Sequence, residues 1–152
     1  MKEAKSTPQF CALIADDQAP MRTIVRTILR SLGVKHIVEV SDGAQALVEL
    51  EFRNTKFPTK KPATSAYDSQ PKKRVNLVVC DWNMPELTGL QLLECVRRNE
   101  ELKRLPFIML TAQDSEKEIV SAIQLGVTDY ITKPFPAKVL ETKVMAILDR
   151  LR

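Results

Sequence analysis

Acidic, hydroxyl and lysine side chains follow short apolar runs at four places in the chain. Asp16 and Asp17 come directly after one run, and Asp81 directly follows another. Thr111 and Lys133 stand at the ends of two later runs. Carboxylates that lie close together repel one another unless a cation relieves them, and an all-oxygen site open to water suits Mg²⁺. If the runs are neighbouring strands, these residues predict a magnesium site with a lysine and a hydroxyl beside it.

The composition argues against several other kinds of chemistry. The chain has one histidine, His36, and three cysteines without a CxxC pair. A disulfide framework, a Cys/His zinc site and a Ser/His or Cys/His nucleophile are therefore not expected. Any chemistry must rely on carboxylates, hydroxyls or lysine.

The elements that must position these residues follow an alternating pattern. Continuous apolar runs, typical of strands covered on both faces, lie at 10–15, 75–80 and 105–110, with shorter candidates at 36–40 and 130–132. Segments with helical spacing or helix-start signals lie between or after them, at 20–32, 43–52 and 90–99, from a capping box at 115–118, and after Pro136. This alternation favours an α/β fold, a doubly wound parallel sheet of five strands with five helices. In such sheets functional groups gather at the carboxyl edge of the strands.

The chain of 152 residues has the length of one domain, and we expect a single domain over residues 1–152. Its net charge of +4 is concentrated in residues 53–74, which carry seven basic side chains against one acidic, Asp68. With three prolines and few apolar residues, this stretch is predicted to be a flexible basic insertion. A solvated surface loop and a docking loop for an acidic partner both fit it. With few aromatic residues, it does not favour nucleic-acid binding.

The hydrophobic pattern contains no membrane-spanning or exported segment. No apolar run reaches the roughly 18 residues of a membrane span, and residues 1–10 lack the apolar stretch of a signal peptide. We therefore expect a cytoplasmic protein without membrane insertion.

Seven short stretches form a combination that is more specific than any one of them. They are Ile14–Asp17, Met21–Arg26, Ser41–Gly43, Cys80–Pro85, Thr88–Gly89, Leu110–Ala112 and Asp129–Phe135. Together they resemble the receiver domain of response regulators, and within that family the single-domain chemotaxis (CheY-like) type. The resemblance implies a flavodoxin-like fold with strand order 2-1-3-4-5. Two features depart from the family pattern: Ala19-Pro20 stands where a capping hydroxyl is usual, and residues 53–74 are inserted.

The resemblance implies a role for each residue of the acidic group. Asp81 would be the phosphoacceptor, which takes a phosphoryl group from a histidine kinase. Asp17 and Asp81 would bind Mg²⁺ directly, Asp16 through water, and Asn83 through its backbone carbonyl. Lys133, aimed inward by a cis bond to the proline that follows it, would contact the Asp81 carboxylate or its phosphoryl group.

The resemblance also implies a switch and an output face. The Thr111 hydroxyl would bond a phosphoryl oxygen, and Thr111 and Tyr130 would carry the change to a protein-binding face. That face would include Ile119, Tyr130 and Lys143. The side chains of Asn83 and Gln113 would set how long the phosphoryl group survives.

The function expected from these observations is that of a monomeric response regulator in two-component signalling. Its phosphodonor would be a histidine kinase, its target the flagellar motor switch in chemotaxis, and a phosphatase is a further candidate partner. One alternative is a stand-alone receiver with a non-motility protein partner. The other is an aspartate-nucleophile phosphohydrolase, but such enzymes place a general-acid carboxylate two residues after the nucleophile, where this chain has Asn83. We therefore expect a signalling switch, not an enzyme.

Overall fold

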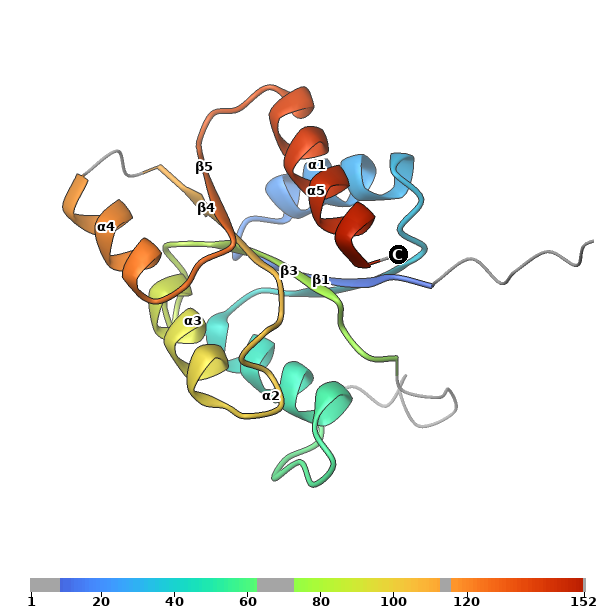
Figure 1. Ribbon diagram of the computed structural model, residues 1–152, viewed down its shortest axis with the longest axis vertical. Helices are drawn as coiled ribbons and strands as arrows, with labels where there is room; N and C mark the ends of the chain where they lie inside the picture. Colours follow the sequence, from blue (N-terminus) through green and yellow to red (C-terminus); the bar gives the residue numbers. More distant parts are fainter. Residues whose placement is uncertain (1–8, 63–72, 113–115, 152) are drawn as a thin grey trace, which may run out of the picture.

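Five parallel strands form one sheet in the computed structural model, which describes residues 9–62, 73–112 and 116–151 (Figure 1). The strands are β1 Cys11–Ala15, β2 His36–Val40, β3 Leu77–Asp81, β4 Phe107–Thr111 and β5 Asp129–Thr132. Their order is β2-β1-β3-β4-β5, and every neighbouring pair is parallel. The expected flavodoxin-like fold is therefore confirmed.

Helices cover both faces of the sheet. They are α1 Ala19–Ser31, α2 Gly43–Asn54, α3 Gly89–Arg98, α4 Glu116–Gln124 and α5 Ala137–Leu151. Helices α1 and α5 lie on one face, and α2, α3 and α4 lie on the other (Figure 1). Because strand residues alternate between the faces, the sheet separates two buried apolar clusters.

The apolar stripes explain how the helices are oriented, with exceptions on α1 and at the end of α5, where Leu151 is exposed. In α1, Val25, Ile28 and Leu29 are buried, but Ile24, which the periodicity places in the same stripe, is 49% exposed. Helix α3 begins with a capping box that we did not predict, in which Thr88 and Gln91 bond each other's backbone N–H. The capping box predicted at 115–118 begins at Ser115, which lies outside the described residues.

The basic insertion begins later than predicted, because its first two residues complete α2. Arg53 and Asn54 are buried in the last turn of this helix. Arg53 Nε donates to Glu49 Oε1 at 2.8 Å, and Arg53 Nη1 donates to the Lys73 carbonyl at 3.2 Å. The Asn54 side-chain amide bonds both the N–H and the C=O of Val75, each at 2.9 Å. The insertion, predicted at about 53–74, therefore begins after Asn54, because these polar side chains hold the end of α2 to the segment just before β3. Its flexibility stays a prediction.

Within the described ranges, no helix is both long and apolar enough to cross a membrane.

Candidate functional site

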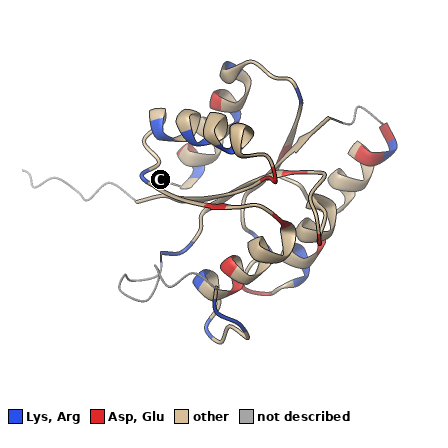
Figure 2. Ribbon diagram, turned by 180° about the vertical axis from the view of Figure 1, so that it is seen from behind, with Lys and Arg blue, Asp and Glu red and all other residues tan. Residues whose placement is uncertain are grey.

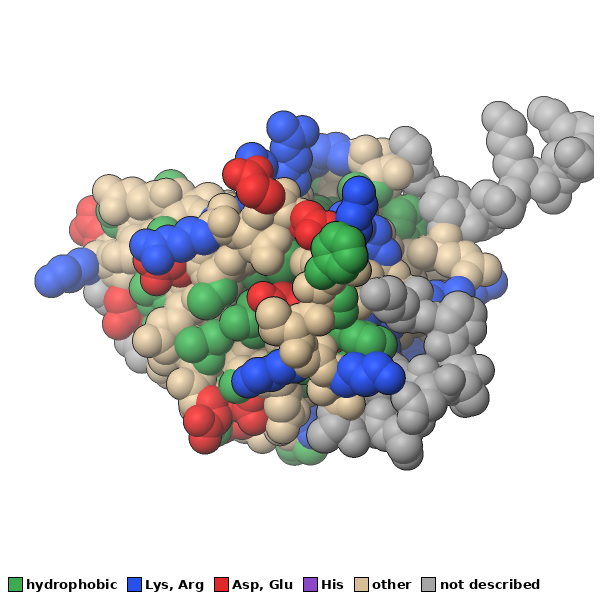
Figure 3. All heavy atoms as spheres, turned by 90° about the horizontal axis from the view of Figure 1, so that it is seen from below, with side chains coloured by type: hydrophobic (Ala, Val, Ile, Leu, Met, Phe, Trp, Pro, Cys, Tyr) green, Lys and Arg blue, Asp and Glu red, His purple; other side chains and the backbone are tan. Residues whose placement is uncertain are grey.

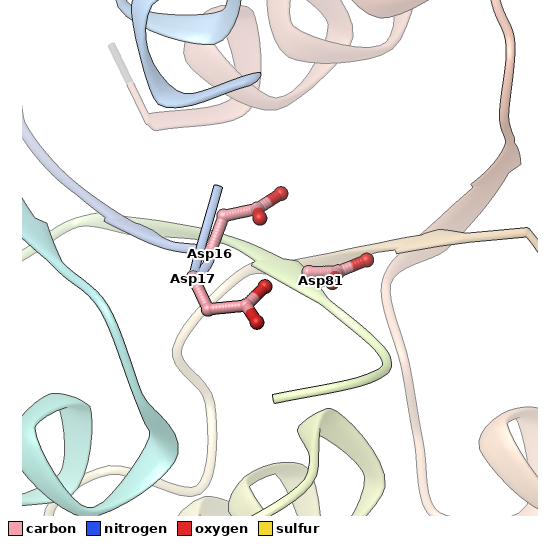
Figure 4. A group of neighbouring side chains, drawn as sticks. All are labelled: Asp16, Asp17 and Asp81. Atoms are coloured by element: carbon pink, nitrogen blue, oxygen red, sulfur yellow. The ribbon is translucent and has the colours of Figure 1, made fainter. Parts of the chain in front are cut away.

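Three carboxylates converge where β1 and β3 end. The two strands are hydrogen-bonded neighbours with Ala15 opposite Cys80, so Asp16 and Asp81 follow at the same level. One oxygen from each of Asp16, Asp17 and Asp81 lies within 4.8 Å of the other two (Figure 4). The convergence expected from neighbouring strand ends is present.

The three carboxylates differ in their exposure to water. Asp16 is 1% exposed and Asp81 is 7% exposed, whereas Asp17 is exposed. In Figure 4, Asp16 lies on the side of α1 and α5, and Asp17 lies on the side of α2 and α3. The group therefore has a buried inner part and an opening to solvent, as a hydrated cation needs.

Lys133 is the basic side chain bonded to this group. Its Nζ donates to Asp81 Oδ1 at 2.8 Å and to Asp16 Oδ2 at 3.4 Å. Its backbone N–H bonds the Thr111 carbonyl at 2.7 Å, which fixes the chain at the end of β5 beside β4. The Lys133–Pro134 peptide bond is cis, as the resemblance implied.

The pKa values of Asp81 and Lys133 are both raised, for different reasons. Burial raises the pKa of Asp81, and the charges of Asp16 and Asp17 add to this effect, against the lowering by the hydrogen bond and charge of Lys133. Burial alone would lower the pKa of Lys133, but bonding and attraction to Asp81 and Asp16 outweigh burial and raise it. Three carboxylates carry more negative charge than Lys133 neutralises, and a divalent cation would supply the missing positive charge.

An arginine that we did not predict supports the turn at Asp16. Arg22, in the first turns of α1, donates from Nη1 to the Asp16 backbone carbonyl at 2.6 Å. Its Nε lies 3.3 Å from Glu39 on β2, and Glu39 also pairs with Arg26. Only the spacing after Asp16 could have indicated this contact, because an arginine on a helix usually faces solvent.

The loop that follows Asp81 is fixed by close backbone packing. The Gly89 N–H bonds the Trp82 carbonyl at 2.8 Å. A Cβ at Gly89 would overlap the Asp81 carbonyl, and one at Gly43 would overlap the Leu87 carbonyl. These two glycines let α2 and α3 approach the loop directly.

Two of the other predicted site residues, Thr111 and Asn83, lie in the part of the chain that the structure describes. Thr111 is buried at the end of β4, one residue beyond Leu110, which pairs with Asp81. Asn83 is exposed in the loop after β3, and Gln113 lies outside the described residues.

The predicted output residues lie on α4, β5 and α5. Tyr130 is partly buried and packs against the apolar cluster of α2, α3 and α4. Ile119 is half-buried on α4. Lys143 on α5 is held at 2.9 Å from Asp129 on β5. The three are thus distributed over consecutive elements around the β5 edge of the sheet.

A parallel α/β sheet with a carboxylate group and a lysine at its carboxyl edge defines a receiver-type fold and site. Residues 50–145 match the response regulator receiver domain. The chain is 39% identical over 139 residues to the chemotaxis protein CheY of Pseudomonas aeruginosa, covering 91% of this chain and 96% of that one. The chain therefore belongs to the response regulator receiver family, with CheY proteins of chemotaxis among its relatives.

Solved structures agree on the fold. The chemotaxis response regulator CheY4 of Vibrio cholerae superposes with a TM-score of 0.72 at 23% identity, covering 92% of this chain and 99% of that one. The receiver domain of a sensor histidine kinase from Pseudomonas aeruginosa gives 0.71 at 25% identity, over 93% and 99% of the two chains. That structure holds a magnesium ion in its active site cleft.

Proposed function

We propose that this chain is a phosphorylation-switched response regulator of two-component signalling, and that Asp81 accepts the phosphoryl group from a histidine kinase. The observation that carries the proposal is the position of Asp81. It is a buried carboxylate at a strand end, bonded to Lys133 at 2.8 Å and adjoined by Asp16 and Asp17. Membership of the receiver family supports the same assignment.

The transfer needs a nucleophile in line and fixed charges around the phosphoryl oxygens. An Asp81 oxygen attacks the phosphorus of the phosphohistidine, the P–N bond breaks, and its electron pair stays on the imidazole nitrogen. The product is an acyl phosphate on Asp81. Lys133 stays protonated, since its pKa is raised, and its ammonium pairs with the negative charge that the phosphoryl group adds. The Thr111 hydroxyl donates to a phosphoryl oxygen.

The residues present fit Mg²⁺. The candidate donors are all oxygens, three of them lie within 4.8 Å of one another, and their charge exceeds that of Lys133. Asp17 and Asp81 would hold the ion directly, Asp16 through water, and Asn83 through its backbone carbonyl. When bound, Mg²⁺ neutralises charge on the phosphoryl oxygens.

The output proposed is protein binding by a single receiver domain that acts as a monomer. Ile119, Tyr130 and Lys143 would contact the target, and Asn83 and Gln113 would set the lifetime of the phosphoryl group. The similarity to the chemotaxis protein CheY of Pseudomonas aeruginosa supports a role in chemotaxis, and we propose the flagellar motor switch as the target rather than a non-motility partner.

The test is to incubate the full chain with Mg²⁺ and acetyl phosphate and to measure its intact mass. We expect a labile adduct of one phosphoryl group that Asp81→Asn abolishes and that Asp149→Asn, a matched change at an exposed carboxylate, retains. An adduct that persists in Asp81→Asn would refute the assignment. Steady release of phosphate from a small phosphomonoester would favour the phosphohydrolase instead.

A further inference from the structure

A basic tip, residues 55–62, projects from the end of α2 (Figures 1 and 2). Phe57 is 89% exposed, the highest fraction among the exposed large hydrophobic side chains of the described residues. Lys56, Lys60 and Lys61 are exposed beside it, and residues 55–62 contain no acidic side chain. Figure 3 views the molecule from the side toward which the tip projects and shows basic, hydrophobic and scattered acidic side chains together.

The base of the tip is firmly held, so the exposure of Phe57 does not follow from a detached segment. The Thr55 hydroxyl donates to the Glu51 carbonyl at 2.6 Å. The Lys56 N–H donates to the Glu101 carboxylate at 3.1 Å. Behind these bonds lies the buried Glu49–Arg53 ion pair. The fold thus presents a phenylalanine to water one residue beyond a fixed backbone.

The basic tip lies at the opposite end of the sheet from the acidic group. Arg74, which is exposed, donates to the Asn54 carbonyl at 3.2 Å and therefore lies at the base of the tip. Arg74 precedes β3, whereas Asp81 is the last residue of that strand. A partner at the tip would leave the acidic group free to meet its phosphodonor.

We propose that the basic tip docks on the surface of an anionic phospholipid bilayer, with Phe57 entering the interfacial region and the lysines lying among the headgroups. An exposed aromatic side chain between cationic ones suits this boundary, where apolar burial and attraction to anionic lipid act together. This proposal does not depend on the phosphorylation chemistry.

The kind of charge favours a lipid surface over an acidic protein or a nucleic acid. The cations of the tip are all lysines, whose ammonium groups are compact, strongly hydrated charges. They lack the planar guanidinium with which arginine forms two parallel hydrogen bonds to a carboxylate or phosphate. Single-stranded nucleic acid calls for a groove with several stacking rings, and the described tip projects with one. A flat anionic surface needs only diffuse attraction and an apolar anchor.

The test is co-sedimentation of the full chain with vesicles of phosphatidylcholine, alone or mixed with phosphatidylglycerol. We expect binding to the mixed vesicles only, weakened by added salt. Lys60→Glu/Lys61→Glu should lower the affinity by at least about tenfold, and Phe57→Ser should lower it several-fold. Lys117→Glu/Lys138→Glu, the same change in net charge at exposed positions on α4 and α5, should leave binding unchanged.

Several outcomes would overturn the proposal. Equal weakening by the control pair would mean that only the net charge of the protein matters. Undiminished binding of Phe57→Ser would exclude Phe57 as an anchor in the bilayer. Binding of polyglutamate or of a single-stranded oligonucleotide through the tip, without binding of mixed vesicles, would assign it to an acidic protein or a nucleic acid. Circular dichroism and the acetyl phosphate reaction confirm that each variant is folded.

Discussion

The acidic group is arranged for chemistry at the expense of stability. Asp81 and Asp16 are buried next to each other with one lysine between them, and Asp17 adds a third negative charge. Burial disfavours an ionised carboxylate unless its partners compensate fully, and the raised pKa of Asp81 indicates that they do not. We therefore expect the free protein to bind a cation at this group and to gain from a phosphoryl group that pairs with Lys133.

Asp81→Asn should stabilise the metal-free protein at neutral pH. Because the pKa of Asp81 is raised in the folded state, ionisation destabilises the fold as the pH rises from the ordinary value of 3.8 through the folded pKa. The amide removes this loss, so the Tm should increase by a few degrees. The gain should vanish below the ordinary pKa, where the carboxyl is protonated whether folded or not. Thermal unfolding of both proteins in chelator at a series of pH values measures this gain in Tm. A gain that does not depend on pH would show that it does not come from the ionisation of Asp81.

Mg²⁺ should change the fluorescence of Trp82, the single tryptophan of the chain. Trp82 directly follows Asp81 and is buried, so its indole should report on a cation at the acidic group. Titration at constant ionic strength should give a saturable change. Asp17→Asn should weaken binding by about tenfold or more, because it removes a ligand and a charge.

Asp149→Asn is the matched control for this titration and should bind as the unmodified chain does. An insensitive indole would give no signal even with the ion bound, so calorimetry under the same conditions is decisive. If it detects no Mg²⁺ binding, the acidic group is not a metal site.

At the scale of elements, the sequence predicts the position of the acidic group better than the contacts of the arginines that support nearby elements. Parallel strands share one carboxyl edge, so the positions of Asp16 and Asp81 after apolar runs suffice to bring them together. The contact of Arg22 with the Asp16 carbonyl depends on the rotation of α1, which an apolar stripe fixes only approximately, as the exposure of Ile24 shows. Arg53 was assigned to an insertion because a charged residue in a basic run is usually solvated, and its partner Glu49 gives no signal of burial.

The buried ion pair of α2 yields a prediction about stability. Arg53→Met should destabilise the protein by about 3 kcal/mol, because Glu49 would remain buried without its partner. The double variant Glu49→Leu/Arg53→Met should recover much of this loss, since it leaves no unpaired charge. Urea unfolding of the two variants, with Arg98→Met of the exposed pair Glu94–Arg98 as control, measures the difference. A double variant no more stable than Arg53→Met would show that the bond from Arg53 to the Lys73 carbonyl matters more than the pair.

At the scale of the whole molecule, the acidic group lies at the sheet edge where both apolar clusters end. Asp16 and Asp81 continue the strand positions of Ile14 and Val79, which pack against α1 and α5. Thr111 continues the position of Met109, which packs in the other cluster together with Tyr130. A bond from the Thr111 hydroxyl to a phosphoryl group on Asp81 would therefore join the two sides of the sheet.

Thr111→Ala should separate phosphorylation from the response of the output face. Beryllofluoride, which mimics the phosphoryl group on Asp81, should alter amide hydrogen exchange in α4 and β5 of the unmodified chain. In Thr111→Ala the change should be much smaller, because the connecting hydroxyl is absent, while the mimic still binds. Thr132→Ala, its exposed neighbour in register on β5, is the control. An equal change in Thr111→Ala would exclude this residue as the connection.

The close packing around Gly43 and Gly89 bears on how such a chain can diverge in evolution. Because neither position has room for a Cβ, the loop over residues 82–88 is enclosed between two helices and the end of β3. An insertion or deletion in that loop would displace a helix, so lineages should keep its length constant. The tip at residues 55–62 is hydrogen-bonded at its base through Thr55 and Lys56, and we expect extra residues beyond these bonds to be added or lost without disturbing the sheet. Variation in length should thus accumulate at the tip and be removed by selection in the loop over residues 82–88.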